Sequence, residues 1–334
     1  MKKTKKNEPQ TFGDWAYLAI KKHLNYTIKH ETDVLKDTDP EALHQMRVGM
    51  RRLRTAMHGF APAVALPKSA QEPKVAKIAR QLGELRDLDV QQETLQNQIA
   101  VLPKEEQDTL KKVLATLGKQ RKKTLEKVQN TLESSSYQKL IAAFKDWLEE
   151  PTYGELAELS IYEILPDLLL PSVSQLFLHP GWIVGVNIDA GEIEIPRDLD
   201  SEKVRQLLDT YGDRVHSLRK QAKRVRYQME LFTDFYDDTY KNYLKDIKEV
   251  QSLLGEIQDS FVLAEFLSDV DADFMLKLPT LATQLTETRY QVWQKWQALQ
   301  QRYLNPEIRK DFHASILQPV LKVEKKEQKL EQAE

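Results

Sequence analysis

Basic side chains recur at helical spacing in two parts of the sequence. In each part they stand at positions i, i+3, i+7 and i+10, which lie on one face of a helix. The first row is His44, Arg47, Arg51 and Arg54, and the second row is His216, Arg219, Lys223 and Arg226. Arginine donates two parallel hydrogen bonds and keeps its charge, so each row suits phosphate oxygens. A linear row also matches a linear polyanion better than a compact anion.

Further cations lie beside the two rows. The additional candidates for contact with an anion are Arg52, His58 and Arg86 in the first half, and Lys220 and Arg224 in the second. His58 extends the first row, but Glu230 stands at the corresponding position of the second half. Arg86 is close in sequence to Asp87 and Asp89, so a structural salt bridge and a ligand contact are both open for it.

The formal net charge of -2 hides a strong segregation of charge. Residues 42–71 contain five Lys or Arg and no acid, and residues 214–229 contain six and no acid. Exposed helices usually mix the two signs, because like charges one turn apart destabilise a helix. A solvated helix face is the ordinary explanation for charged positions. Two rows without compensating acids instead favour a bound anion.

The sequence contains an internal duplication. Two sequence blocks recur: residues 44–54 match residues 216–226, and residues 82–87 match residues 254–259. The second block begins 38 residues after the first in both halves, so one offset of 172 relates both pairs. This indicates a duplicated gene. Gly83 and Gly255, in the second block, are interpreted as positions of close helix packing rather than as phosphate cradles.

The composition predicts an all-α fold. With only 11 Gly and 14 Pro, and abundant Lys, Glu, Gln and Leu, long helices are favoured. The expected helices span about 12–36, 40–60, 74–101, 104–132, a shorter stretch after 136, turns within 155–178, then 201–210, 213–236, 238–270 and 279–304. Alternating apolar residues around Asp189-Ala190-Gly191 predict a small β-hairpin at about 182–195, whose role the sequence does not indicate.

Several classes of function are not expected. There is no cysteine, which excludes disulfides, thiolate catalysis and a Cys-based zinc site. The basic first residues lack the apolar run of a signal peptide, and the apolar stretch at 161–170 is too short to span a bilayer. We therefore expect a cytoplasmic protein that does not contact a membrane. Motifs of nucleotide binding or hydrolysis are missing, so no enzyme activity, cofactor or metal is expected.

The signature H-x-x-R-x-x-x-R/K-R-x-R, used twice, resembles that of the CHAD family, the conserved histidine α-helical domain. The resemblance extends from the first helix to about residue 305. It implies two four-helix bundles related by a pseudo-twofold axis, which face each other across a basic cleft. It also implies binding of inorganic polyphosphate and association with polyphosphate granules. On this basis polyphosphate-metabolising enzymes are further expected partners.

The resemblance sets the expected domains. They are a first helical bundle at 11–150, a connecting segment with helical turns and the hairpin at 151–200, a second bundle at 201–320, and a charged tail at 321–334. Two departures from the family pattern stand out. Gln258 replaces Arg86 in the second half, and the hairpin is an addition. Glu192-Ile-Glu194 begins like the E-x-E-x-K strand of the triphosphate tunnel enzymes that often accompany CHAD domains, but the lysine is missing.

Two alternatives remain beside polyphosphate binding. An RNA-binding module would also use arginine rows, although single-strand binders interleave aromatic platforms, and only Tyr227 lies near a row here. Nucleic acid is therefore not the expected partner. A polyphosphate-processing enzyme is the other alternative, and release of phosphate from long chains with added magnesium would support it.

Overall fold

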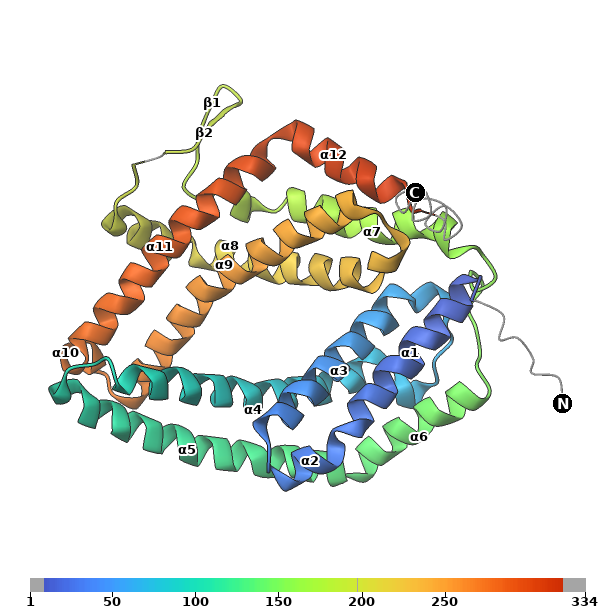
Figure 1. The fold of residues 1–334 in the computed structure, drawn as a ribbon, viewed down its shortest axis with the longest axis horizontal. Coiled ribbons are helices and arrows are strands. Elements are labelled where there is room, and N and C mark those ends of the chain that lie inside the picture. Colours follow the sequence, from blue (N-terminus) through green and yellow to red (C-terminus); the bar gives the residue numbers. More distant parts are fainter. Residues whose placement is uncertain (1–8, 197, 321–334) are drawn as a thin grey trace, which may run out of the picture. The chain divides into compact units, whose positions relative to one another are not determined.

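The computed structural model describes residues 9–196 and 198–320, and it is helical apart from one small hairpin (Figure 1). The all-α prediction with a small hairpin is confirmed. The described residues fall into two compact units. Unit 1 takes its residues from Met1–Asn97 and Leu114–Ile164, and unit 2 from Gln98–Val113 and Leu165–Glu334. The predicted charged tail at 321–334 lies outside the described residues.

Unit 1 is built on α1 to α6, except that the end of α4 and the start of α5, within Gln98–Val113, belong to unit 2. Their bounds are α1 Phe12–Lys29, α2 Glu31–Lys36, α3 Pro40–Gly59, α4 Glu72–Ile99, α5 Lys104–Glu133 and α6 Ser135–Glu149. Short 3-10 turns η1 (Ala61–Ala63) and η2 (Lys68–Ala70) occupy the loop before α4. A capping box of Thr11 and Asp14 starts α1, and Asp39 with Pro40 starts α3 as the sequence predicts. The single helix expected over 12–36 is divided at His30, which ends α1 and begins α2.

The apolar face of α3 anchors the first row. Met46, Met50 and Leu53 are at most 1% exposed, and α3 packs against α1. Each such side chain contributes about 1.5–3 kcal/mol when it is fully buried. The row residues lie on the face of α3 opposite these buried side chains. Burial of the apolar face therefore fixes the direction in which the first row points.

Unit 2 contains α7 to α12 and the hairpin. The bounds are α7 Ile161–Phe177, η3 Pro180–Ile183, β1 Asn187–Asp189, β2 Glu192–Glu194, α8 Ser201–Leu231, η4 Thr233–Phe235, α9 Asp238–Val270, α10 Phe274–Lys277, α11 Pro279–Leu304 and α12 Pro306–Leu317. The first residues of α7 belong to unit 1. Helix α8 packs against α9 and α11, and its Leu218, Ala222 and Met229 are fully buried. The second row therefore has the same kind of support as the first.

Several elements of unit 2 differ from the sequence prediction, among them the short helix α10, which was not predicted. The helices expected at 201–210 and 213–236 form one helix, α8, because Gly212 continues it without a break. Helix α12 was not predicted. The hairpin is confirmed but shorter than 182–195, because Trp182 and Val184 are buried and their carbonyls accept hydrogen bonds from the Gln300 side chain. These residues serve the core of unit 2 rather than a strand.

Residues Ile161–Ile183 are long and apolar enough to cross a membrane by length and composition alone. Within this stretch α7 ends at Phe177 and a separate 3-10 turn begins at Pro180. Leu165, Leu169 and Val173 of α7 are buried in the protein. A helix in the core of a folded unit shows the same burial.

Candidate anion-binding site

The first row lies on α3 and gains a member from α4. Burial is the main cause that lowers the pKa of His44. The positive charges of Arg86, Arg47 and Arg51 lower it further, against the raising effect of Glu41. Arg86, which is 42 residues after His44 in sequence, therefore stands with the first row. One histidine and three arginines from two helices share one electrostatic environment.

One of the two carboxylates close to Arg86 in sequence, Asp89, is paired with another arginine. Asp89 accepts from the Nε of Arg121 at 2.6 Å, and Arg121 also forms a two-pronged pair with Asp37 at 2.8 Å. These groups are largely buried, so Arg121 joins α5 to α4 and to the end of α2. No ion pair of Arg86 is found among the described residues. Asp89 is thus the partner of Arg121, which has a structural role, and both interpretations of Arg86 stay predictions.

The second row lies on α8 against α9. Burial again is the main cause that lowers the pKa of His216, helped by the charges of Lys220 and Arg219. Asp213 and a hydrogen bond with Gln258 act in the opposite direction. Gln258 thus stands beside His216 as Arg86 stands beside His44. The substitution found in the sequence replaces a cation of the site with a neutral amide.

A glycine of the second sequence block lies against an arginine of the first block in both halves. A Cβ atom on Gly83 would lie 3.7 Å from the Nε of Arg47, and one on Gly255 would lie 3.2 Å from the Nε of Arg219. At both glycines the neighbour is the side chain of a row arginine on another helix.

A carboxylate neutralises one end of each row. Arg54 pairs with Glu72 of α4 at 2.5 Å, and Arg226 pairs with Glu230 at 3.0 Å. The expectation that both rows lack compensating acids is therefore wrong at these ends. Folding brings Glu72 onto α3, and one helical turn brings Glu230 to Arg226.

Two further ion pairs involve the second row or its partner Glu230. Arg219 lies 3.7 Å from Asp259, whose side chain is 75% exposed, so water screens this pair. Glu230 is shared with Lys248 of α9 at 3.2 Å. The Nε of Arg219 and the Nδ1 of His216 are buried and have no hydrogen-bond partner within the part of the chain that the structure describes. Donor capacity therefore remains in the second row.

The other predicted site residues differ in how exposed their side chains are. Arg51 and Lys223 are half-buried within their rows, whereas His58, Arg52, Lys220 and Arg224 are exposed. Arg52 lowers the pKa of His23, so its charge acts on α1 rather than on the first row. The guanidinium of Arg226 lies 5.5 Å from the ring centroid of Tyr227.

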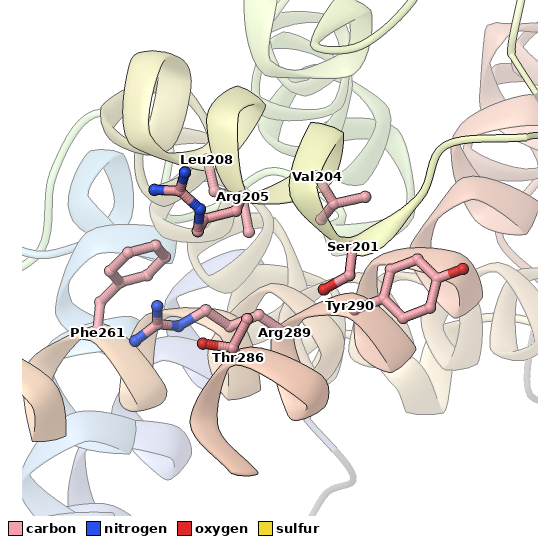
Figure 2. A pocket seen from close by; sticks show the side chains of 8 residues that line it. All are labelled: Ser201, Val204, Arg205, Leu208, Phe261, Thr286, Arg289 and Tyr290. Carbon is pink, nitrogen blue, oxygen red and sulfur yellow. The ribbon is translucent and has the colours of Figure 1, made fainter. Parts of the chain in front are cut away.

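A buried pocket of unit 2 does not suit a phosphate (Figure 2). Its volume is about 10 Å³, which is room for roughly one water molecule. Arg289 lines it but donates to Ser260 at 2.9 Å and lies 4.0 Å from the Phe261 ring centroid. Across residues 9–196 and 198–320, no three His, Asp or Glu side chains are grouped to hold a metal ion.

Comparison with known proteins identifies the fold. The family model of the CHAD domain matches residues 18–268. The chain is similar in structure to the CHAD domain from the plant Ricinus communis, with 21% sequence identity, 92% of each chain covered and a TM-score of 0.58. It is also similar to PptA from Streptomyces chartreusis, with 14% identity, 88% of this chain and 100% of that chain covered, and a TM-score of 0.61. No curated protein matches the chain.

Proposed function

Because the chain belongs to the CHAD domain family, we propose that it binds inorganic polyphosphate through the first and second rows, without catalysing a reaction. The observation that carries this proposal is the cation cluster of unit 1. His44, Arg47 and Arg86 come from two helices, and no ion pair of Arg47 or Arg86 occurs among the described residues. Grouped like charges destabilise a fold, and a bound polyanion would offset that cost.

We propose binding without catalysis because carboxylates at the ends of the rows are already paired with cations. Cleavage of a phosphoanhydride needs an activated water, and a carboxylate is a common base for that purpose. Two carboxylates at the ends of the rows are paired with cations, Glu72 with Arg54, and Glu230 with Arg226 and Lys248. A third, Asp259, lies 3.7 Å from Arg219. The rows themselves offer hydrogen-bond donors, which hold phosphate oxygens.

The test is titration with polyphosphate of defined chain lengths. Affinity should rise with length and then level off, and log K should fall with log salt at a slope of about -0.7 per phosphate neutralised, the value for single strands. Arg47→Glu and Lys220→Glu should each weaken binding by about tenfold or more, as expected for a lost charge-assisted hydrogen bond.

Matched controls make the result specific. Lys145→Glu on α6 and Lys245→Glu on α9 change an exposed lysine of the same unit by the same charge. They should bind almost as the wild type does. Equal losses in controls and row variants, or wild-type binding by the double variant Arg51→Glu, Lys223→Glu, would show that the rows are not the site.

Two competitors complete the test. RNA at equal phosphate concentration should displace polyphosphate poorly, because only Tyr227 offers a base-stacking surface near a row. Efficient displacement would favour an RNA-binding module. Phosphate release from long chains with magnesium would favour a processing enzyme. In cells, we propose a cytoplasmic location on polyphosphate granules, near polyphosphate-metabolising enzymes, and a fluorescent fusion carrying Arg47→Glu should leave the granules.

A further inference from the structure

A groove in unit 2 runs between the hairpin and α11. Its volume is about 950 Å³, and its lining includes Glu194, Ile195, Pro196 and Asp198 on the hairpin side and Gln297 and Gln301 on α11. The Gln297 side chain donates to the carbonyl of Pro196 at 3.0 Å, which fixes the chain after β2 to α11. The groove is therefore built by a defined contact.

The hairpin presents an open strand edge to this groove. Strand β2 pairs only with β1 among the described strands. Residues of β2 and of the chain after it line the groove, whereas no residue of β1 does. The outer edge of β2 therefore borders a space that is large enough for one extended peptide.

Turn geometry tells which backbone groups point outward. Ala190 and Gly191 have φ values of 47° and 88°, which is the pattern of a two-residue type I′ turn. Such a turn makes the flanking Asp189 and Glu192 a hydrogen-bonded pair, so the next pair, Ile188 and Ile193, is not hydrogen-bonded. The N–H and C=O of Ile193 are consequently directed away from β1. They can receive another strand.

The surface around this edge is acidic and partly apolar. Glu194 and Asp198 line the groove, and the sequence of residues 187–198 has four acidic residues and one basic residue, Arg197. Ile188 and Ile193 face each other across the hairpin and are 54% and 47% exposed. A two-stranded hairpin is marginally stable alone, and a third strand would cover such side chains.

We propose that this groove binds an extended Lys- or Arg-bearing segment of another protein, which adds as a third strand beside β2. Backbone hydrogen bonds at Ile193 would supply pairing, and Glu194 and Asp198 would select the basic side chains. The required charge is opposite to that of polyphosphate. This site is thus independent of the two rows and of the function proposed for them.

The experiment uses the full chain and fluorescein-labelled peptides read by anisotropy. The probe alternates Lys and Val over seven residues, and its counterpart alternates Glu and Val. The Lys peptide should bind at least about tenfold more tightly, and added salt should weaken it. Glu194→Lys with Asp198→Lys should weaken its binding by about tenfold or more. Two exchanges on β1, Asn187→Lys and Asp189→Lys, are controls that should change it much less.

A second series tests strand pairing itself. Peptides N-methylated at alternate residues lose the N–H groups of one edge only. One of the two alternating sets should abolish binding and the other should preserve it, because a strand pairs through one edge. Equal binding of both sets, equal binding of the Lys and Glu peptides, or equal losses in both charge variants would overturn the proposal. Binding of the Lys peptide only after removal of residues 321–334 would also overturn it, since the occupant would then be the chain's own tail. Unchanged polyphosphate binding and circular dichroism would show that each variant is folded.

Discussion

The Nε of Arg219 lies 3.2 Å from the position that a Cβ atom on Gly255 would take, a separation shorter than ordinary van der Waals contact. Gly255 is thus the residue of α9 that lets a row arginine lie flat against that helix. Gly83 and Arg47 lie against each other in the same way in unit 1, but at 3.7 Å, which is an ordinary van der Waals separation. Both halves of the duplication therefore share the glycine–arginine contact between the two sequence blocks, as well as the sequence of the blocks.

Gly255→Ala should therefore weaken polyphosphate binding severalfold, because the guanidinium of Arg219 must move by a few tenths of an ångström. Gly212→Ala on α8 is the matched control, since a Cβ there meets nothing within 4 Å. That control should raise the free energy of unfolding by about 0.5–1 kcal/mol through helix propensity and leave binding unchanged. Titration and urea unfolding measure the two effects. Wild-type affinity of Gly255→Ala would contradict the role given to this glycine.

Glu230→Gln should increase affinity for polyphosphate. Glu230 holds Arg226 at 3.0 Å and Lys248 at 3.2 Å, so its neutralisation makes two cations available to an anion. The salt dependence should also become steeper, because more phosphates are neutralised. Isothermal titration at two salt concentrations measures both quantities. The control is Glu256→Gln, an exposed acid of α9, and an equal gain there would point to net charge alone.

Binding of polyphosphate should take up protons. Burial holds the pKa of His44 and His216 below 6.5 in the unbound protein. Nearby phosphates favour the protonated form and raise both pKa values, so affinity should increase as pH falls from about 7 towards 5. Calorimetry in buffers of different ionisation enthalpy counts the protons, with long chains that carry few terminal phosphates. The double variant His44→Gln, His216→Gln should flatten the pH dependence, and a wild-type slope in that variant would exclude these histidines.

His23 should make the fold less stable in acid. Burial, with the charges of Lys22 and Arg52, lowers its pKa from 6.5 to about 4. The unfolded chain therefore binds this proton more tightly, and the free energy of unfolding should fall as pH drops from about 6.5 to about 4. Above 6.5 both states are neutral and no effect is expected. Urea unfolding of wild type and His23→Gln across this range should show a shallower decline in the variant, and parallel curves would contradict the assignment.

The helices that support the site were predicted from the sequence more accurately than the ion pairs between their side chains. Helix bounds at 40–60, 104–132, 238–270 and 279–304 agree closely with α3, α5, α9 and α11. Apolar residues at helical spacing, such as Met46 and Met50, showed which side of α3 is buried and so where the first row points. The partners of Arg54 and Arg121 could not be predicted in this way, because Glu72 and Asp37 approach them only after the helices pack.

The sequence by itself determined the duplication, the all-α class, the composition of both rows and the family resemblance, because each depends on spacing along one chain or one helix. Only the tertiary structure decided that Arg86 stands with His44, that Gly83 and Gly255 lie against row arginines, and that Glu72 and Asp259 approach the rows. These relationships join residues on different helices. Their distances follow from how side chains fill the space between packed helices, and helical periodicity alone carries no information about that.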